Sequence, residues 1–93
     1  MTRDQVHARV VVALGELQAS SGQPAEAAEG TTRPIGDLTG FDSHAGLEFT
    51  CAIEVSIGID VPIDENLCVD DARNRARTVA EIVGRIMELQ KGT

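Results

Sequence analysis

Ser43 is the residue of this chain best placed for covalent chemistry, because it stands between an acid, Asp42, and an imidazole, His44. A serine beside a histidine could act as a nucleophile with its general base. Consecutive residues of a helix point about 100° apart, however, so Ser43 and His44 would not face each other. No Gly-x-Ser-x-Gly elbow is present, and no residues suggest an oxyanion hole or a third orienting group. His7 is expected to be a solvated residue. The sequence therefore does not predict an enzyme.

A second possibility is that Ser43 carries an attached group. Asp42 is a good N-cap, which places Ser43 in the first turn of a helix. A phosphate ester there would lie among free backbone amides, near the positive end of the helix dipole. Gly40 before the serine and Ala45-Gly46 after it leave the position unobstructed. Serine is also common at helix starts, so this position alone favours an ordinary helix-start residue over an attachment site.

Metal ligation and disulfide formation find little support in the sequence. Cys51 and Cys68 are too few for a disulfide framework, and neither has a cysteine or histidine at zinc-ligand spacing. Reduced thiols in the cytoplasm are the simplest interpretation. A group of acids lies in the second half of the chain: Asp60, Asp64, Glu65, Asp70 and Asp71. Because these lack the spacing and the central glycine of an EF-hand, we expect a solvated loop and no metal site.

The helix that begins at Ser43 is expected to span residues 43–57, since Gly58 suits its end and Pro62 prevents its resumption. Helical spacing places Gly46, Phe49, Ile53 and Ile57 on one side, which we expect to face the core. It places His44, Glu48, Cys51 and Val55 on the other, flanked by Leu47 and Glu54. Apolar residues among acids are typical of a docking surface. Single exposed apolar residues are also ordinary, so both interpretations stay open.

Two further long helices are expected, over residues 2–19 and 78–90. Each begins with a threonine and has Gln or Glu at capping-box spacing, and each continues with apolar residues on one face. Gly46 is expected to weaken the middle helix without having a role of its own; the alternative, that it leaves room on the core face near Ser43, stays open.

The connecting segments are expected to be mostly irregular. Residues 20–42 form a long loop, from which Ile35, Leu38 and Phe41 can reach the core. Residues 63–67 could form a short third helix within an extended polar surface loop over 63–77. No alternating pattern of useful length predicts a strand. We therefore expect an all-α fold with three longer helices and at most one short third helix.

Composition limits the classes of partner. The 93 residues allow a single domain, 1–93. Acidic residues outnumber basic ones by 15 to 8, a net charge of −7, and only two residues are aromatic. Nucleic acid and anionic membrane surfaces are therefore not expected as partners, whereas a basic protein surface is the electrostatic complement. On charge alone, the simpler interpretation is that the acidity keeps the protein soluble. The N-terminal residues lack the apolar core of a signal peptide, and we expect a cytoplasmic protein.

Five stretches together resemble the acyl carrier protein family. These are Gly40-Phe41-Asp42-Ser43-His44, Leu47-Glu48, Ile53-Glu54, Ile59-Asp60-Val61-Pro62 and Thr78-Val79-Ala80-Glu81-Ile82. The family attaches 4'-phosphopantetheine to the serine of a Gly-x-Asp-Ser-Leu motif at the start of its second helix, and its closing proline lies at the same distance from the serine as Pro62. Asp-Ser alone carries almost no information, so the resemblance depends on the joint match.

The resemblance implies a small four-helix bundle with three longer helices and one short third helix. It also implies a non-enzymatic carrier of acyl intermediates, held as thioesters on an arm attached to Ser43 and flanked by Asp42. The arm would come from coenzyme A through a phosphopantetheinyl transferase. Acyl-transfer or synthase enzymes with basic docking patches would then bind the second helix. The residues expected to contact such partners are His44, Leu47, Glu48, Cys51, Glu54, Val55 and Asp60. A monomer is expected, because a freestanding carrier must release each partner.

Departures from the family pattern favour a specialised carrier in lipid, fatty-acid or polyketide-type biosynthesis. His44 replaces the usual leucine, and Ala45 and Val55 occupy positions that are often acidic. The segment 64–77 is longer than usual by about two helical turns of residues. Two alternatives remain open: an aminoacyl or peptidyl carrier, which Asp42 and the acidity disfavour, and a carrier-like interaction module that is never modified.

Overall fold

The chain forms a small helical protein with one short β-hairpin. The computed structural model describes residues 1–24 and 26–92. Its elements follow in the order α1 (Arg3–Ser20), α2 (Pro34–Asp37), α3 (Ser43–Ile53), the π-helix η1 (Glu54–Gly58), β1 (Val69–Asp70), β2 (Arg75–Ala76) and α4 (Val79–Lys91). Within the described residues, no helix has both the length and the apolar character needed to cross a bilayer.

Capping residues determine where the two terminal helices begin. The hydroxyl of Thr2 accepts a hydrogen bond from the Gln5 amide, and the Gln5 side chain accepts one from the Thr2 amide. Thr78 and Glu81 repeat this reciprocal arrangement at the start of α4. These capping boxes satisfy amides that a helix start otherwise leaves unpaired. The helices expected over 2–19 and 78–90 are thereby confirmed, each displaced by one residue.

The middle helix, expected over 43–57, ends in a wider turn than the sequence indicates. The regular part, α3, stops at Ile53, and η1 continues as a single π-helical turn to Gly58. Gly58 has a φ of 77°, a left-handed conformation that reverses the chain there. The Glu54 carboxylate accepts a hydrogen bond from the Val61 amide, 3.1 Å away, and so ties this turn to the segment that follows.

The segment 63–77 differs from expectation. Residues 63–67 do not form the short third helix; a hydrogen bond from the Glu65 amide to the Pro62 carbonyl closes an isolated turn instead. The polar part is a β-hairpin, with Val69 opposite Ala76 and Asp70 opposite Arg75. Two residues per strand are too few to produce an alternating pattern, so no strand was predicted here. The short helix α2 was likewise expected to be loop.

Two carboxylates attach the hairpin and its neighbouring segments to α4. Glu81 makes a bidentate pair with Arg75 of β2 and also lies 3.6 Å from Arg33. Glu65 makes a bidentate pair with Arg85 of α4 and lies 3.4 Å from Arg77. These ion pairs therefore join the hairpin and the residues on either side of it to α4.

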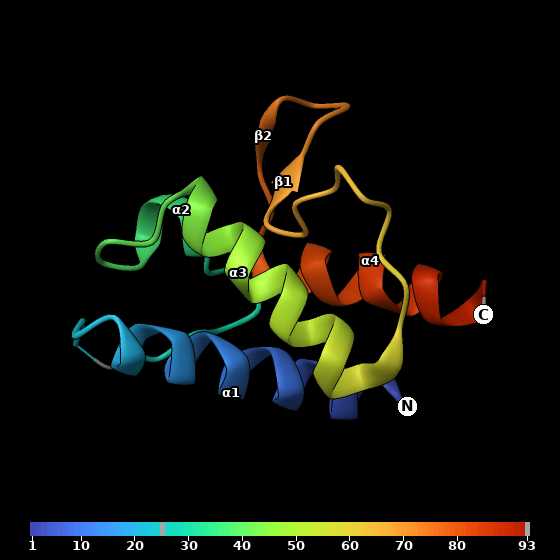
Figure 1. Cartoon of the computed structure of the whole chain (residues 1–93), viewed down its shortest axis with the longest axis horizontal. Helices are drawn as coiled ribbons and strands as arrows, with labels where there is room; N and C mark the ends of the chain where they lie inside the picture. Colours follow the sequence, from blue (N-terminus) through green and yellow to red (C-terminus); the bar gives the residue numbers. More distant parts are fainter. Residues whose placement is uncertain (25, 93) are drawn as a thin grey trace.

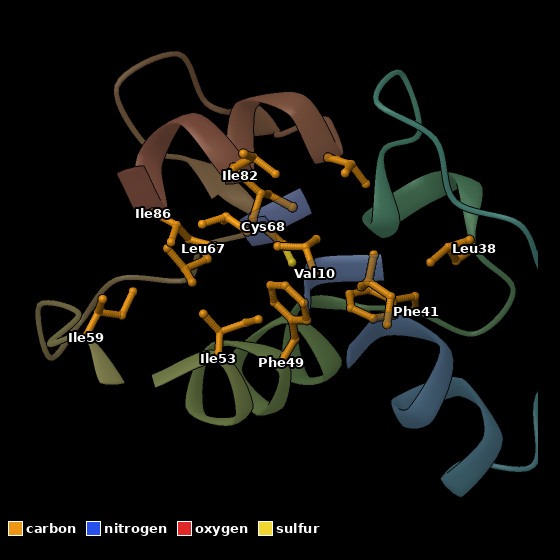
Figure 2. Close-up of a cluster of buried hydrophobic side chains, with 14 residues drawn as sticks. Val10, Leu38, Phe41, Phe49, Ile53, Ile59, Leu67, Cys68, Ile82 and Ile86 are labelled. Carbon is orange, nitrogen blue, oxygen red and sulfur yellow. The ribbon is translucent and has the colours of Figure 1, made fainter. Parts of the chain in front are cut away.

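The core lies where α1, α3 and α4 meet (Figure 1). Helix α1 contacts both α3 and α4. The hairpin projects on the side of the molecule away from α1 (Figure 1). Figure 2 shows Phe49 and Ile53 of α3 pointing toward Leu67 and Cys68, with Val10 of α1 nearby. The buried apolar residues are Val6, Val10, Leu14, Leu38, Phe41, Phe49, Ile53, Ile59, Leu67, Cys68, Val79, Ile82, Val83 and Ile86. The expected core contacts of Leu38 and Phe41 are confirmed, and Ile35 packs against the cluster half-buried.

Candidate functional site

Ser43 is the first residue of α3 and is exposed. Asp42 caps the helix as expected, since its Oδ1 accepts a hydrogen bond from the Ala45 amide at 2.9 Å. The helical hydrogen bonds begin with the Gly46 amide, which donates to the Asp42 carbonyl. The hydroxyl of Ser43 and the amides of Ser43 and His44 have no hydrogen-bond partner among the described residues. An anionic group on Ser43 Oγ would thus meet unpaired N–H groups at the positive end of the helix.

His44 is held away from a catalytic role on Ser43. Its Nε2 lies 2.9 Å from Oε1 of Glu48, one helical turn further along. Both side chains are exposed, and no hydrogen bond joins His44 to the Ser43 hydroxyl in the described chain. A nucleophile needs its base within hydrogen-bond reach. The described residues therefore do not bring Ser43 and His44 together as a nucleophile and its base.

The outward face of α3 and η1 carries apolar side chains in contact with solvent. Leu47 is 47% exposed and Val55 is 87% exposed, and Cys51 lies exposed between them. The carboxylates of Glu48 and Asp60 are exposed as well. The exposure of Leu47, Glu48, Cys51 and Val55 agrees with the helical spacing, whereas Asp60 lies beyond the end of η1. Glu54 differs, because it is half-buried and its carboxylate is already bonded to the Val61 amide.

Asn66 is a residue at this site that the sequence did not point to. Its Nδ2 donates to the Ser43 carbonyl at 2.9 Å, and its Oδ1 accepts from the Cys68 amide at 3.0 Å. A Cβ at Gly46 would lie 2.6 Å from Oδ1 and 2.8 Å from Nδ2 of Asn66. Gly46 thus has a packing role, contrary to the expectation that it has none. The only signal in the sequence was a glycine inside a helix, where it costs about 1 kcal/mol relative to alanine.

The two cysteines lie in different surroundings, and both are free. Cys51 is exposed on the outward face of α3, whereas Cys68 is fully buried in the core. Burial raises the pKa of the Cys68 thiol to about 12, which keeps it protonated and inert at neutral pH. Cys68 therefore acts as a small apolar core residue.

Charge is distributed unevenly around the site. Residues 34–72, which include α3 and η1, contain nine acids and no Lys or Arg. Five of the eight basic residues are Arg33, Arg73, Arg75, Arg77 and Arg85, on or beside the hairpin and α4. The hydrogen bond from Arg85 is the main cause that lowers the pKa of Glu65. The Thr78 amide, followed by Arg75, lowers the pKa of Glu81 to about 2. These arginines are thus largely paired with carboxylates, whereas Glu48, the one acid of α3, pairs with His44 and with no Lys or Arg among the described residues.

Two surface hollows of the described residues are lined by residues other than Ser43. The structure has a surface hollow of about 620 Å³ between residues 62–65, the hairpin and α4, and another of about 320 Å³ between α1 and the α3–η1 segment. Ser43 borders neither of them. The described residues also contain no group of three or more His, Cys, Asp or Glu side chains that could hold a metal ion. The site is an exposed helix start beside an acidic and apolar face.

Comparison with protein-family models, with curated proteins and with solved structures finds no match to this chain. Its function is therefore inferred from the residues and the geometry.

Proposed function

We propose that this protein is a non-enzymatic carrier that holds acyl groups as thioesters on a 4'-phosphopantetheine arm attached to Ser43. The observation that carries the proposal is the exposed, unpartnered hydroxyl of Ser43 at the first position of a capped helix. Amides without partners in the described chain surround that position and fit a phosphodiester. The sequence resemblance to acyl carrier proteins through Asp42-Ser43 and the rest of α3 supports the same assignment.

Attachment would be a phosphoryl-group transfer made by a separate transferase. Ser43 Oγ forms a bond to the phosphorus next to the pantetheine of coenzyme A, and the pyrophosphate P–O bond breaks. The leaving group is adenosine 3',5'-bisphosphate, and the hydroxyl proton passes to a base of the transferase. The base is assigned to the transferase because His44, the imidazole next to Ser43, is paired with Glu48.

The partners fitting the outward face are enzymes with a basic rim around an apolar contact area. Leu47 and Val55 would supply the apolar contacts, and Glu48 and Asp60 the charges. His44 stands where related carriers have leucine, which favours a specialised carrier in lipid, fatty-acid or polyketide-type biosynthesis. A monomeric carrier in the cytoplasm is part of the proposal.

We also propose that the fold is related to the four-helix bundle of acyl carrier proteins. The three longer helices of that bundle would correspond to α1, to α3 with η1, and to α4. The segment from Ile59 to Arg77, with its hairpin, would replace the short third helix.

The test is intact-protein mass spectrometry after incubation with coenzyme A and a broad-specificity phosphopantetheinyl transferase. We expect the wild type to gain one arm and Ser43→Ala to gain none, because only Oγ of Ser43 is the acceptor. If several transferases fail on the wild type, His44→Leu is tested next. Modification of that variant would mean that His44 selects a dedicated transferase, and its failure would contradict the carrier function in favour of an unmodified interaction module.

A further inference from the structure

Gly46 has no conformational reason to be glycine. It lies inside α3, and its φ is not among the positive values of Gly22, Gly36, Gly40 and Gly58. Alanine at such a position would favour the helix by about 1 kcal/mol. What glycine provides is space, since a Cβ would overlap the Asn66 carboxamide at 2.6 to 3.1 Å. The pair Gly46 and Asn66 is therefore one structural unit, which we call the Gly46–Asn66 contact.

The Gly46–Asn66 contact acts on the backbone of the proposed attachment residue. The Ser43 carbonyl receives a hydrogen bond from Asn66 Nδ2, in addition to the one that an α-helix provides. A carbonyl has two lone pairs and can accept both. Asn66 is itself fixed, because its Oδ1 accepts from the Cys68 amide. The peptide group that follows Ser43 is thus anchored to a segment outside the helix.

The anchoring segment is immobilised from both sides. Leu67 and Cys68, which follow Asn66, point into the core opposite Phe49 and Ile53 (Figure 2). The Arg77 amide donates to the Cys68 carbonyl at 2.8 Å, and its guanidinium donates to the Leu67 carbonyl at 3.2 Å. Helix ends commonly fray. The start of α3 is instead hydrogen-bonded to Asn66, which adjoins the buried residues Leu67 and Cys68.

We propose that Asn66 is a positioning residue for Ser43: through the Gly46–Asn66 contact it fixes the first turn of α3, and so the direction in which Ser43 Oγ is presented to the transferase. This inference rests on the carrier function proposed above. A hydroxyl on a fixed backbone reaches the reacting phosphorus in one orientation, whereas a frayed turn presents several. The first turn of α3 has no other side-chain tie of this kind to the segment 66–68.

Thr50 provides a matched control. Its hydroxyl donates to the Gly46 carbonyl at 2.8 Å and accepts from the Leu67 amide at 3.0 Å, so it ties the same segment to α3 one turn further along. Thr50→Val removes this tie without touching Ser43. A general loss of stability would affect both variants, whereas a loss of positioning would affect only Asn66→Ala.

The experiment measures kcat/KM for transfer of the arm to the apo protein, by mass spectrometry, at a temperature where every variant is folded. We expect Asn66→Ala to lower kcat/KM about fivefold, the effect of one hydrogen bond, and Thr50→Val to remain near the wild type. Gly46→Ala should slow transfer similarly, because it displaces the carboxamide. Adding Gly46→Ala to Asn66→Ala should cause no further slowing, since the carboxamide is already gone. Amide exchange in the first turn of α3 should be faster in Asn66→Ala than in Thr50→Val.

Three results would overturn the inference, and they are distinguishable. Transfer to Asn66→Ala at the wild-type rate would exclude a positioning role while leaving the carrier function intact. Equal slowing of Asn66→Ala and Thr50→Val, in step with their melting temperatures, would show an effect on stability alone. Absence of any transfer to the wild type would instead contradict the carrier function itself, and this inference with it.

Discussion

At the scale of single residues, the Thr78–Glu81 capping box is also an ion-pair site. Glu81 Oε1 accepts from the Thr78 amide at 2.8 Å, and its other oxygen lies 2.6 Å from Arg75. These contacts lower the pKa of Glu81 from its ordinary value of 4.5 to about 2. A carboxylate whose pKa is depressed on folding stabilises the protein above pH 4.5, and the contribution disappears as pH falls toward 2.

Glu81→Gln should therefore destabilise the protein in a pH-dependent manner. The amide can still accept the Thr78 hydrogen bond but loses the charge that pairs with Arg75 and Arg33. We expect the melting temperature at pH 7 to fall by about 5 °C, the effect of about 1 kcal/mol in a domain of this size. The difference from wild type should narrow at pH 3. Glu16→Gln, which removes an exposed carboxylate on α1, is the control. A constant difference at both pH values would show that the charge is not responsible.

At the scale of the elements, the helices were predictable and the hairpin was not. Helix starts are encoded locally, by Thr2, Asp42 and Thr78 and the residues three positions on, so sequence alone places α1, α3 and α4 closely. The hairpin depends on contacts distant in sequence, such as Arg75 with Glu81 and Val69 with Ala76. Its strands are too short to show a period.

The candidate site was predictable to the same extent. The exposure of Ser43, Leu47 and Val55 follows from helical spacing and is confirmed. The contact of Asn66 with Gly46 crosses 20 positions of sequence and depends on the irregular segment after η1, so no local pattern reveals it. The hydrogen bond that the Glu54 carboxylate accepts from the Val61 amide was not predictable either, because it requires the chain reversal at Gly58.

Glu65, like Glu81, connects separate parts of the fold. It lies in the segment after η1 and pairs with Arg77, which follows β2, and with Arg85 of α4. Its side chain is 16% exposed and contacts Arg77 and Arg85, of which Arg85 makes two hydrogen bonds. Glu65→Gln would leave two largely buried arginines without their carboxylate. We expect the free energy of unfolding to fall by about 2 kcal/mol, less than for a fully buried pair because solvent reaches part of the network.

Urea denaturation and amide exchange would test this expectation for Glu65→Gln. Exchange should accelerate from residue 62 through the hairpin while α1 is little affected, because the lost contacts are local to that region. The matched control is Glu88→Gln, whose carboxylate is 71% exposed and lies 4.0 Å from Arg85. We expect that control to change the free energy of unfolding by less than about 0.5 kcal/mol. Equal effects of the two variants would contradict the role assigned to Glu65.

At the scale of the whole molecule, charge is unevenly distributed along the chain. Residues 34–72 contain nine acids and no Lys or Arg, and of these acids Glu65 and Asp70 are paired with arginines near the hairpin. Under the proposed function, a transferase with a basic surface would be attracted to the exposed acids of this stretch, which includes Ser43. Long-range attraction of this kind accelerates encounter and weakens with salt.

The rate of arm transfer to Ser43 should consequently depend on ionic strength, because salt screens the carboxylates on and near α3. We expect kcat/KM to fall about tenfold between low and high salt, mainly through KM, because steering affects encounter more than chemistry. The double variant Glu48→Gln/Asp60→Asn should lower kcat/KM at low salt and flatten the salt dependence. Glu16→Gln/Glu29→Gln changes the net charge equally but lies outside the stretch 34–72, and should behave as the wild type. If the two double variants respond alike, net charge rather than its placement on α3 governs encounter, and the assignment of this face as the docking surface fails.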